Sequence, residues 1–315
     1  MKNVTLLLIA TICISLSNCA TNKNFTLPVL PDTQGEVGDK TAMIKSQVEW
    51  LAANKKKLQI PIVLHVGDLV NFNNIQHYKN ADTAMKVLDD ANIPYALAVG
   101  NHDTEAVGEF SGSAAPGNVN ANLRKTTKLN TFFPISRLTA QKGQFEASKI
   151  DNAYYIFKKG GLNWLVVTLE FCPRQGAIDW ANTVVAKFPK HNVIILTHYF
   201  LTPRGTINQT NAGYGNLSSQ AIYDQLVKKH ANILMVLSGH VCYSAFKTDI
   251  GEKGNTVYEI LQDYQNEDFG GGYIRLLEIS PKKKTIAARM YSPYYNKEKA
   301  DTSTFSFSKV NFIKP

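Results

Sequence analysis

Polar side chains that can bind metals or transfer protons follow several apolar segments of this chain. The apolar run Pro94–Val99 stops at Gly100, and Asn101, His102 and Asp103 follow at once. A short apolar run of this kind is typical of a buried strand in a parallel sheet. Ligands of open α/β sheets bind just beyond the carboxyl ends of the strands, so these three side chains are candidates for chemistry. Taken alone, they could equally cap a loop.

Four other predicted strands end in side chains of the same kind. The runs 25–30, 60–66, 193–196 and 233–237 are followed, in that order, by Asp32 and Gln34, by Asp68, by His198, and by His240 and Cys242. One histidine after a strand is more often structural than a ligand, but five such ends at one edge of one sheet indicate a shared site. Oxygen donors with neutral imidazoles suit zinc, iron or manganese. Two such ions can clamp the attacking and leaving oxygens of an in-line displacement.

The elements that must position these side chains alternate along the chain. Asp39 can cap a helix whose apolar residues recur on one face, and further helices are predicted over 81–91, around Trp180 and over 218–230. This alternation indicates successive βαβ units. Patterning lapses between Thr104 and Asn152, which we interpret as a wall or lid over the site, or else as a disordered surface excursion. From Val257 onward the pattern predicts a second, antiparallel sheet packed on the first.

Length and charge exclude several classes of protein. The 315 residues are enough for one large α/β domain, and the absence of a linker predicts a single domain over 25–315. The formal charge is +9, but the lysine clusters are scattered and are typical of solvated helix ends and turns. Without an arginine-rich helix or a basic stripe, no specific nucleic-acid binding is expected.

The N-terminus predicts export. Lys2 precedes an apolar run from Val4 to Leu16, which is too short for a transmembrane helix but fits a signal peptide over 1–18. Residues 16–19, Leu-Ser-Asn-Cys, resemble a bacterial lipobox, so Cys19 is expected to carry lipid and 19–24 to form a tether. The expected location is the periplasm or the outer membrane, with a lipid anchor on Cys19. Ordinary secretion is the alternative.

The order of the polar motifs resembles that of the calcineurin-like metallophosphoesterase superfamily, whose motifs run Asp-x-His, Gly-Asp, Gly-Asn-His-Asp/Glu, His and Gly-His-x-His. The chain is most similar to the branch whose first motif is Pro-Asp-Thr-Gln, here residues 31–34, and the match extends from Leu30 to about Arg275. The resemblance implies an α/β fold, a four-layer α/β/β/α sandwich of two mixed sheets flanked by helices. It also implies a metal-dependent phosphoric ester hydrolase.

The resemblance assigns a role to each candidate residue. Asp68 would bridge two divalent ions (zinc, manganese or iron), Asp32 and Gln34 would bind the first ion, and the second would be completed by Asn101, His198 and His240. His102 would contact the phosphoryl group and protonate the leaving oxygen, and Asp103 would orient that imidazole. A metal-bound hydroxide would attack a phosphomonoester or phosphodiester, with a phosphorylated small molecule or lipid as substrate.

Two residues depart from the family pattern. Gln34 stands where histidine is commonest, and Cys242 stands where the last motif has its second histidine. These departures predict a first metal site that is poor, exchangeable or filled only with substrate present. They keep open a second interpretation, a catalytically impaired surface lipoprotein that keeps the fold and one metal site. A substrate-binding lipoprotein of a transporter is excluded, because no two-lobed repeat is visible.

The cysteines bear on the same site. Cys172 and Cys242 each follow a predicted buried strand, and unpaired thiols are a liability in an oxidising compartment. We therefore expect a disulfide between Cys172 and Cys242 beside the metal site. The alternatives are a metal-bound Cys242 with Cys172 merely buried, or two free thiols.

Overall fold

The computed structural model describes residues 24–111 and 122–315, which form two mixed β-sheets. The strands of the first sheet are β1 (Phe25–Leu30), β2 (Val63–His65), β3 (Tyr95–Leu97), β11 (Ile274–Ser280), β12 (Thr285–Ser292), β13 (Lys297–Glu298) and β14 (Phe305–Phe307). Their order is β13-β12-β11-β1-β2-β3, with β14 paired to β12. Strands β1, β2 and β3 are parallel, and β11 pairs antiparallel with β1.

The second sheet faces the first and contains the middle of the chain. Its strands are β4 (Gln141–Gln144), β5 (Ala153–Lys159), β6 (Leu162–Thr168), β7 (Asn192–Leu196), β8 (Ile233–Ser238), β9 (Ser244–Ile250) and β10 (Thr256–Gln262). Their order is β4-β5-β6-β7-β8-β10-β9, and the four strands β6, β7, β8 and β10 run parallel. The carboxyl ends of the parallel strands therefore lie together at one edge of this sheet.

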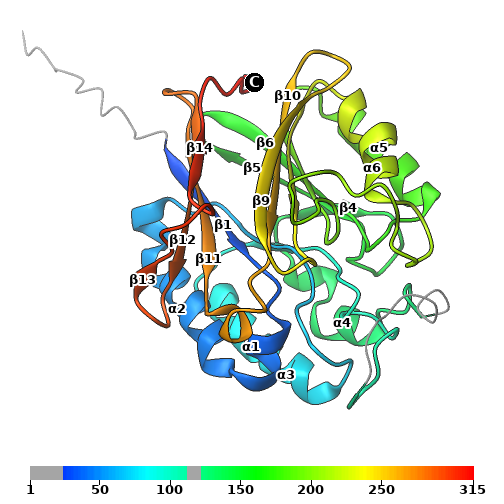
Figure 1. Ribbon diagram of the computed structural model, residues 1–315, viewed down its shortest axis with the longest axis vertical. Helices are drawn as coiled ribbons and strands as arrows, with labels where there is room; N and C mark the ends of the chain where they lie inside the picture. The colour runs from blue at the N-terminus through cyan, green and yellow to red at the C-terminus, as the bar shows by residue number, and fades with distance from the viewer. Residues whose placement is uncertain (1–23, 112–121) are drawn as a thin grey trace, which may run out of the picture.

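Helices cover the outer face of each sheet (Figure 1), and this arrangement confirms the predicted four-layer sandwich. The helices beside the first sheet are α1 (Gln34–Asp39), α2 (Thr41–Leu58) and α3 (Ile75–Asp90), and α4 (Thr127–Phe132) packs against α3. Helices α5 (Gln175–Lys187) and α6 (Ser219–Gln225) cover the second sheet. Three single turns of 3-10 helix complete the set: η1 (Ile135–Arg137), η2 (Val227–Lys229) and η3 (Asp268–Gly270).

The apolar runs that predicted the central strands are explained by burial on both faces. In β6, Trp164 and Val166 point into the core between the two sheets, whereas Leu165 and Val167 point into the core beneath α5 and α6. A parallel strand covered on both sides reads as a continuous apolar run. The same holds for β7, whose five residues are all buried.

The prediction that Asp39 caps the start of a helix is wrong, because Asp39 belongs to the short helix that precedes the predicted one. Asp39 is the last residue of α1, and α2 begins at Thr41. The apolar stripe of α2 is nevertheless as expected, since Met43, Val48 and Leu51 are buried. Helix α2 ends at Leu58, and Gln59, which follows it, has a left-handed backbone (φ 55°).

Two expectations about the sheets are wrong. The five strand ends do not belong to one sheet, because β1, β2 and β3 lie in the first sheet while β7 and β8 lie in the second. The chain after Val257 does not form a separate antiparallel sheet either. Strand β10 joins the second sheet parallel to β8, and β11 to β14 extend the first. Burial explains the division: six of the seven residues of β10 are buried, whereas burial alternates along β12, which is typical of a half-exposed antiparallel strand.

The segment from Thr104 to Asn152 has more regular structure than its composition predicted. Its described part contains α4, η1 and β4. Residues 1–23, which carry the predicted signal peptide and lipobox, and residues 112–121 lie outside the described residues. Of the helices within 24–111 and 122–315, none has the length and apolar character needed to cross a bilayer.

Candidate metal centre

The two sheets bring their strand ends together at one end of the sandwich. The loops after β1 and β2 of the first sheet carry Asp32 and Asp68, and the loops after β7 and β8 of the second sheet carry His198 and His240. Metal-binding atoms of Asp68, His198 and His240 all lie within 4.8 Å of one another. The predicted cluster is therefore present, although it is assembled from two sheets rather than one.

The contacts within this cluster are short. Nε2 of His198 lies 3.2 Å from Oδ2 of Asp68 and 3.9 Å from Oδ2 of Asp32. Nδ1 of His240 lies 3.2 Å from the same Nε2 of His198. The backbone N–H of His240 donates to Oδ2 of Asp32 at 3.0 Å, which ties the loop after β8 to the loop after β1.

The ring of His198 is oriented so that a lone pair faces the carboxylates. Its Nδ1 lies 2.9 Å from the carbonyl oxygen of Val66, which can only accept, so Nδ1 carries the hydrogen. In the neutral ring, Nε2 then offers its lone pair toward Asp68. A backbone carbonyl that fixes the orientation of a ligating histidine in this way is usual in metal sites.

The other three predicted ligands each have a buried oxygen atom without a hydrogen-bond partner among the described residues. Oδ1 of Asp32, Oε1 of Gln34 and Oδ1 of Asn101 are buried and have no hydrogen-bond partner there. Buried oxygens without partners are costly, and native proteins rarely keep them without an ion or a water to satisfy them. The donor set therefore fits divalent cations, with oxygen and imidazole ligands that suit zinc, manganese or iron.

The electrostatics of the cluster also fit cations. Burial, together with Asp263 and Asp68, raises the pKa of Asp32 well above its usual value. Burial would also raise the pKa of Asp68, but His198 and the neighbouring imidazoles outweigh burial and hold that pKa below its usual value. Burial and His198 lower the pKa of His240 to about 3, so this imidazole is neutral and has a lone pair to offer.

Two glycines permit the close approach of these loops. A Cβ atom on Gly100 would lie 2.1 Å from Oδ1 of Asp68, and one on Gly239 would lie 2.1 Å from Oδ1 of Asp32. Any side chain at either position would displace a predicted ligand. Each glycine directly precedes a predicted ligand, Asn101 or His240, so the motif spacing has a steric cause.

His102 stands beside the cluster with one ring nitrogen free for a substrate. Its backbone N–H donates to Oδ1 of Asp68 at 2.9 Å, and its Nδ1 lies 2.7 Å from the carbonyl oxygen of Asn71. Because that carbonyl can only accept, Nδ1 carries a hydrogen, and Nε2 is the atom that can exchange a proton. The side chain is partly exposed, as a group that meets a substrate must be.

The role predicted for Asp103 is wrong. Its carboxylate accepts hydrogen bonds from the backbone N–H groups of Gly100 and Leu69, each at 2.8 Å, and of Val70 at 3.3 Å. Asp103 therefore holds the loop after β2 against the loop after β3, and the carbonyl of Asn71 orients the His102 ring. A carboxylate directly after an imidazole in sequence can face either way, and here the backbone amides decide.

The predicted disulfide is also wrong, because Cys172 and Cys242 are both free. Cys172 follows β6 and Cys242 follows β8, and β7 lies between these strands. Neighbouring strands are about 4.8 Å apart, so the two loops start about 10 Å apart. A disulfide spans a Cα separation of at most about 7 Å. Cys172 instead packs in an apolar cluster with Phe171 and Tyr199.

Aromatic rings support the two histidines from one side. The Phe171 ring centroid lies 5.6 Å from that of His198 and 5.1 Å from that of His240, and Tyr199 lies 4.7 Å from His240. Phe171 follows Glu170 at the end of β6, a strand end that the sequence indicated without giving it a role. Packing of this kind limits the rotation of the imidazoles.

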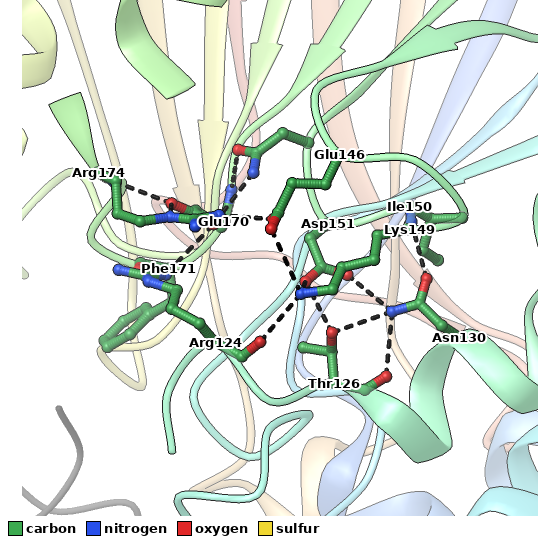
Figure 2. A network of polar contacts seen from close by, with 11 residues as sticks. Arg124, Thr126, Asn130, Glu146, Lys149, Ile150, Asp151, Glu170, Phe171 and Arg174 are labelled. Carbon is green, nitrogen blue, oxygen red and sulfur yellow. Dashed lines mark hydrogen bonds and ion pairs between the residues drawn. The ribbon is translucent and has the colours of Figure 1, made fainter. Parts of the chain in front are cut away.

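A network of charged and polar side chains holds Phe171 in place (Figure 2). In Figure 2, Arg124 donates from Nη1 to the carbonyl oxygen of Phe171 at 2.7 Å. Its Nη2 also donates to the carbonyl oxygen of Cys172 at 2.5 Å. The buried Glu170 accepts from Nη2 of Arg174 at 2.8 Å, and Arg174 also bonds Glu146 at 2.6 Å. The segment between β3 and β5 is thereby joined to the loop after β6.

Sequence reasoning missed two residues beside the first metal site. Asp263 and Gln265 follow β10, and Asp263 is completely buried. The signal was present: Asp263-Tyr264-Gln265 repeats the Asp-x-Gln form of Asp32-Thr33-Gln34, and both follow a strand. The sequence pattern predicts a separate antiparallel sheet after Val257, so it does not place these two residues at the site.

Two sheets flanked by helices, with carboxylate, amide and imidazole groups at their strand ends, define a metallophosphoesterase. Residues 29–244 match the family model described as calcineurin-like phosphoesterase, and the chain belongs to this family. The chain is 30% identical over 305 residues to the uncharacterized protein YvnB of Bacillus subtilis (strain 168), covering 92% of this chain and 22% of that relative. The chain therefore spans only 22% of the length of this relative.

Solved structures with the same fold share little sequence with this chain. A dimetal phosphatase from Danio rerio has a TM-score of 0.57 at 12% identity, over 90% of this chain and 98% of its own. Purple acid phosphatase PPD1 from yellow lupin (Lupinus luteus) seeds has a TM-score of 0.56 at 13% identity, over 90% of this chain and 54% of its own. At these identities the likeness shows the fold.

Proposed function

We propose that the protein hydrolyses a phosphomonoester or phosphodiester at a two-metal centre, by the hydrolytic route predicted from the sequence. The observation that carries the proposal is the convergence of buried oxygens that lack hydrogen-bond partners with the clustered ligand atoms of Asp68, His198 and His240, next to an imidazole with a free Nε2. Such a site binds cations first, and what it then attracts is an anionic group such as a phosphoryl oxygen.

The ligands divide between two ions. Asp68 would bridge them, Asn101, His198 and His240 would complete one set, and Asp32 with Gln34 would belong to the other. Divalent ions held there supply Lewis-acid chemistry and a reactive oxygen nucleophile near neutral pH. The protein fixes the positions of these groups through the carbonyl of Val66 on His198 and the N–H of His240 on Asp32.

His102 would act on the substrate itself. With Nδ1 bound to the carbonyl of Asn71, its Nε2 can donate a hydrogen to a phosphoryl oxygen and then give its proton to the departing alkoxide. The backbone N–H of His102 donates to Asp68, so the residue that carries the general acid also holds the predicted bridging ligand. This coupling keeps the acid at a set distance from the site of reaction.

We also propose that the reaction takes place outside the cytoplasm, on a phosphorylated small molecule or lipid. The sequence of residues 1–23 supports this through its predicted signal peptide and the predicted lipidation of Cys19. Expression of the full chain in a bacterium tests it: the protein should sediment with the membrane fraction, and Cys19→Ala should release it. A wild-type protein that keeps its N-terminus and stays in the cytosol would contradict this location.

A comparison of two substrates tests the activity. Metal-free protein should hydrolyse neither p-nitrophenyl phosphate nor bis-p-nitrophenyl phosphate, and added Mn²⁺ or Zn²⁺ should restore turnover of at least one. The ratio of the two rates then separates monoesterase from diesterase. If protein with both sites filled hydrolyses neither compound nor any of a wider set of phosphoesters, the impaired lipoprotein suggested by Gln34 and Cys242 is the better description.

A further inference from the structure

The loop after β10 lies beside the first metal site and repeats its sequence form. Strand β10 is the parallel neighbour of β8, so Asp263 and Gln265 emerge next to the loop that carries His240 and Cys242. Asp263 is buried completely, and its charge acts on Asp32. The family pattern assigns no role to this loop, so its contacts must show what it does.

The contacts of Asp263 fix the orientation of the Gln265 amide. The carboxylate of Asp263 accepts from the backbone N–H of Cys242 at 2.5 Å and from that of Gln265 at 3.0 Å. It also accepts from Nε2 of Gln265 at 3.2 Å. Because a carboxylate can only accept, the NH₂ end of the Gln265 amide must face it, and Oε1 of Gln265 must face the other way.

On that other side, Gln265 meets Gln34. Oε1 of Gln265 accepts a hydrogen bond from Nε2 of Gln34. The amide of Gln34 is thereby fixed as well, with its own Oε1 turned away from Gln265, buried and without a hydrogen-bond partner among the described residues. An amide oxygen held in this way is available to a cation. The chain of contacts runs from a carboxylate through two amides to one free oxygen.

Cys242 takes part in the same chain as an acceptor. Its Sγ lies 3.1 Å from Nε2 of Gln265, which donates to it. Its backbone is left-handed (φ 46°), and its N–H is engaged by Asp263. The backbone N–H and the thiol of this residue therefore both face the Asp263 and Gln265 side. The thiol therefore occupies the sequence position of the family's histidine but accepts a hydrogen bond instead of binding a metal.

We propose that Asp263 and Gln265 are positioning residues of the first metal site, which aim Oε1 of Gln34 at the ion, and that Cys242 is a hydrogen-bond acceptor rather than a ligand. The inference rests on the proposed two-metal function. It bears on both departures from the family pattern: the amide at position 34 gains the orientation that a histidine ring would have by its shape, and the thiol at position 242 belongs to the hydrogen-bond network that fixes that amide.

A buried arginine holds this loop in place. Arg275 of β11 is fully buried, and its Nη2 donates to the hydroxyl of Tyr264 at 2.7 Å and to Oγ of Ser244 at 2.7 Å. Its Nη1 donates to the carbonyl oxygen of Ser303 at 2.6 Å. Tyr264 lies between Asp263 and Gln265, so the first sheet anchors the loop that the second sheet provides. Arg275 thereby fixes the backbone that carries the Gln265 amide.

Metal titration of Gln265→Ala tests the positioning role. Titration calorimetry of the metal-free full chain with Mn²⁺ should resolve two sites in the wild type. In Gln265→Ala the weaker site should lose about tenfold or more in affinity, as is usual when a residue that orients a metal ligand is removed, while the stronger site keeps its affinity. Gln76→Ala, which removes an exposed glutamine amide from α3, is the matched control and should leave both sites unchanged.

Cobalt spectra of the wild type and of Cys242→Ser test the role of the thiol. A thiolate bound to Co²⁺ gives an intense near-ultraviolet charge-transfer band, and we expect none in the wild type with both sites filled. Cys242→Ser should keep both ions, because serine can accept the same hydrogen bond from Gln265. A band that Cys242→Ser abolishes would overturn the proposal, as would two unchanged sites in Gln265→Ala.

These outcomes are independent of the outcome for the proposed function. A wild type that binds two ions, loses one in Gln265→Ala and hydrolyses no phosphoester would support the positioning role and overturn the function. Activity that persists together with unchanged metal affinities in Gln265→Ala would support the function and overturn the positioning role. The fold of each variant is checked by its thermal midpoint, since a positioning residue changes metal affinity more than stability.

Discussion

His102 is the residue on which turnover should depend most directly. Its Nδ1 is engaged by the carbonyl of Asn71 and its N–H by Asp68, so the free Nε2 is the atom that meets the substrate. His102→Ala should lower kcat on a substrate with a poor leaving group by roughly 10²-fold or more, as removal of a general acid typically does. Metal content should stay at the wild-type level because the side chain is not among the predicted ligands. The checks are steady-state kinetics and metal analysis of the same preparation.

A comparison of two substrates shows whether the loss of kcat in His102→Ala comes from the loss of a general acid. A leaving group such as p-nitrophenolate needs little protonation, so the loss on p-nitrophenyl phosphate should be smaller than the loss on an alkyl phosphate. Equal losses on both compounds would mean that His102 acts by binding the phosphoryl group alone. Full activity on the alkyl phosphate would contradict both roles.

Asp68 and Gln34 should differ in how many ions each controls. Asp68 lies 3.2 Å from His198 and holds the N–H of His102, at the centre of the cluster, whereas Gln34 stands at one side of it. We expect Asp68→Asn to lower the occupancy of both ions and Gln34→Ala to lower mainly one. Metal analysis after dialysis at a fixed Mn²⁺ concentration measures this. Equal loss of both ions from the Gln34 variant counts against the division of ligands.

The positions of these residues could be predicted because each follows a buried apolar run, and strand ends converge in α/β folds. Asp263 and Gln265 could not be found in the same way. Their strand pairs with β8 through residues more than twenty positions away, and nothing in its own pattern distinguishes that partner from another. The role of Asp103 was missed for a similar reason, since its partners Leu69 and Val70 are more than thirty residues away.

At the scale of elements, Arg124 joins the segment before β4 to the loop after β6. Arg124→Ala would leave the carbonyl oxygens of Phe171 and Cys172 without their donor. Loss of hydrogen bonds to a charged donor at a mostly buried site should cost about 2 kcal/mol of unfolding free energy. Urea unfolding measures this. Arg204→Ala, at an exposed arginine, is the control and should change stability by less than about 0.5 kcal/mol.

Strand β10 carries a buried carboxyl group that should make stability depend on pH. Burial and the neighbouring Asp249 raise the pKa of Glu259 to about 8. Its unfolded-state pKa is about 4.3, so the folded protein keeps a proton that the unfolded chain releases, and stability falls as pH rises between these values. Glu259→Gln should therefore stabilise the protein at pH 8 by on the order of 2 kcal/mol, and by much less at pH 5.

Urea unfolding of both proteins across this pH range provides the measurement. Glu252→Gln, at an exposed glutamate on the turn between β9 and β10, is the matched control and should show no such trend. An advantage of Glu259→Gln that stays constant from pH 5 to pH 8 would mean that the carboxyl group does not titrate in this window.

The layers of the fold could be predicted better than the membership of each sheet. Strands β7 and β8 are buried on both faces, so their apolar runs located them to within one residue of the structure. Which sheet each strand joins depends on the core between the sheets, where Leu64 of β2 and Ile194 of β7 belong to one hydrophobic cluster. No pattern within one strand encodes that contact.

For the whole molecule, the candidate metal centre is a junction between the two sheets. Asp32 and Asp68 come from the first sheet, and His198 and His240 come from the second. The hydrogen bonds across the junction, from His198 to Val66 and from His240 to Asp32, also link the two layers. Ions bound here would join the sheets and stabilise the ionised form of Asp32, whose pKa is raised by burial, by Asp263 and by Asp68, in that order.

Removal of metal should therefore lower the stability of the whole fold. A ligand present at about 100 times its Kd stabilises a folded protein by about 2.7 kcal/mol. For a domain of this size, that corresponds to a fall in Tm of about 4 °C for each ion that a chelator strips. Differential scanning calorimetry with and without EDTA measures the shift. His102→Ala should show the full shift because it removes no predicted ligand, whereas Asp68→Asn should show a smaller one. If the wild type melts at the same temperature in both conditions, the ions do not join the two sheets.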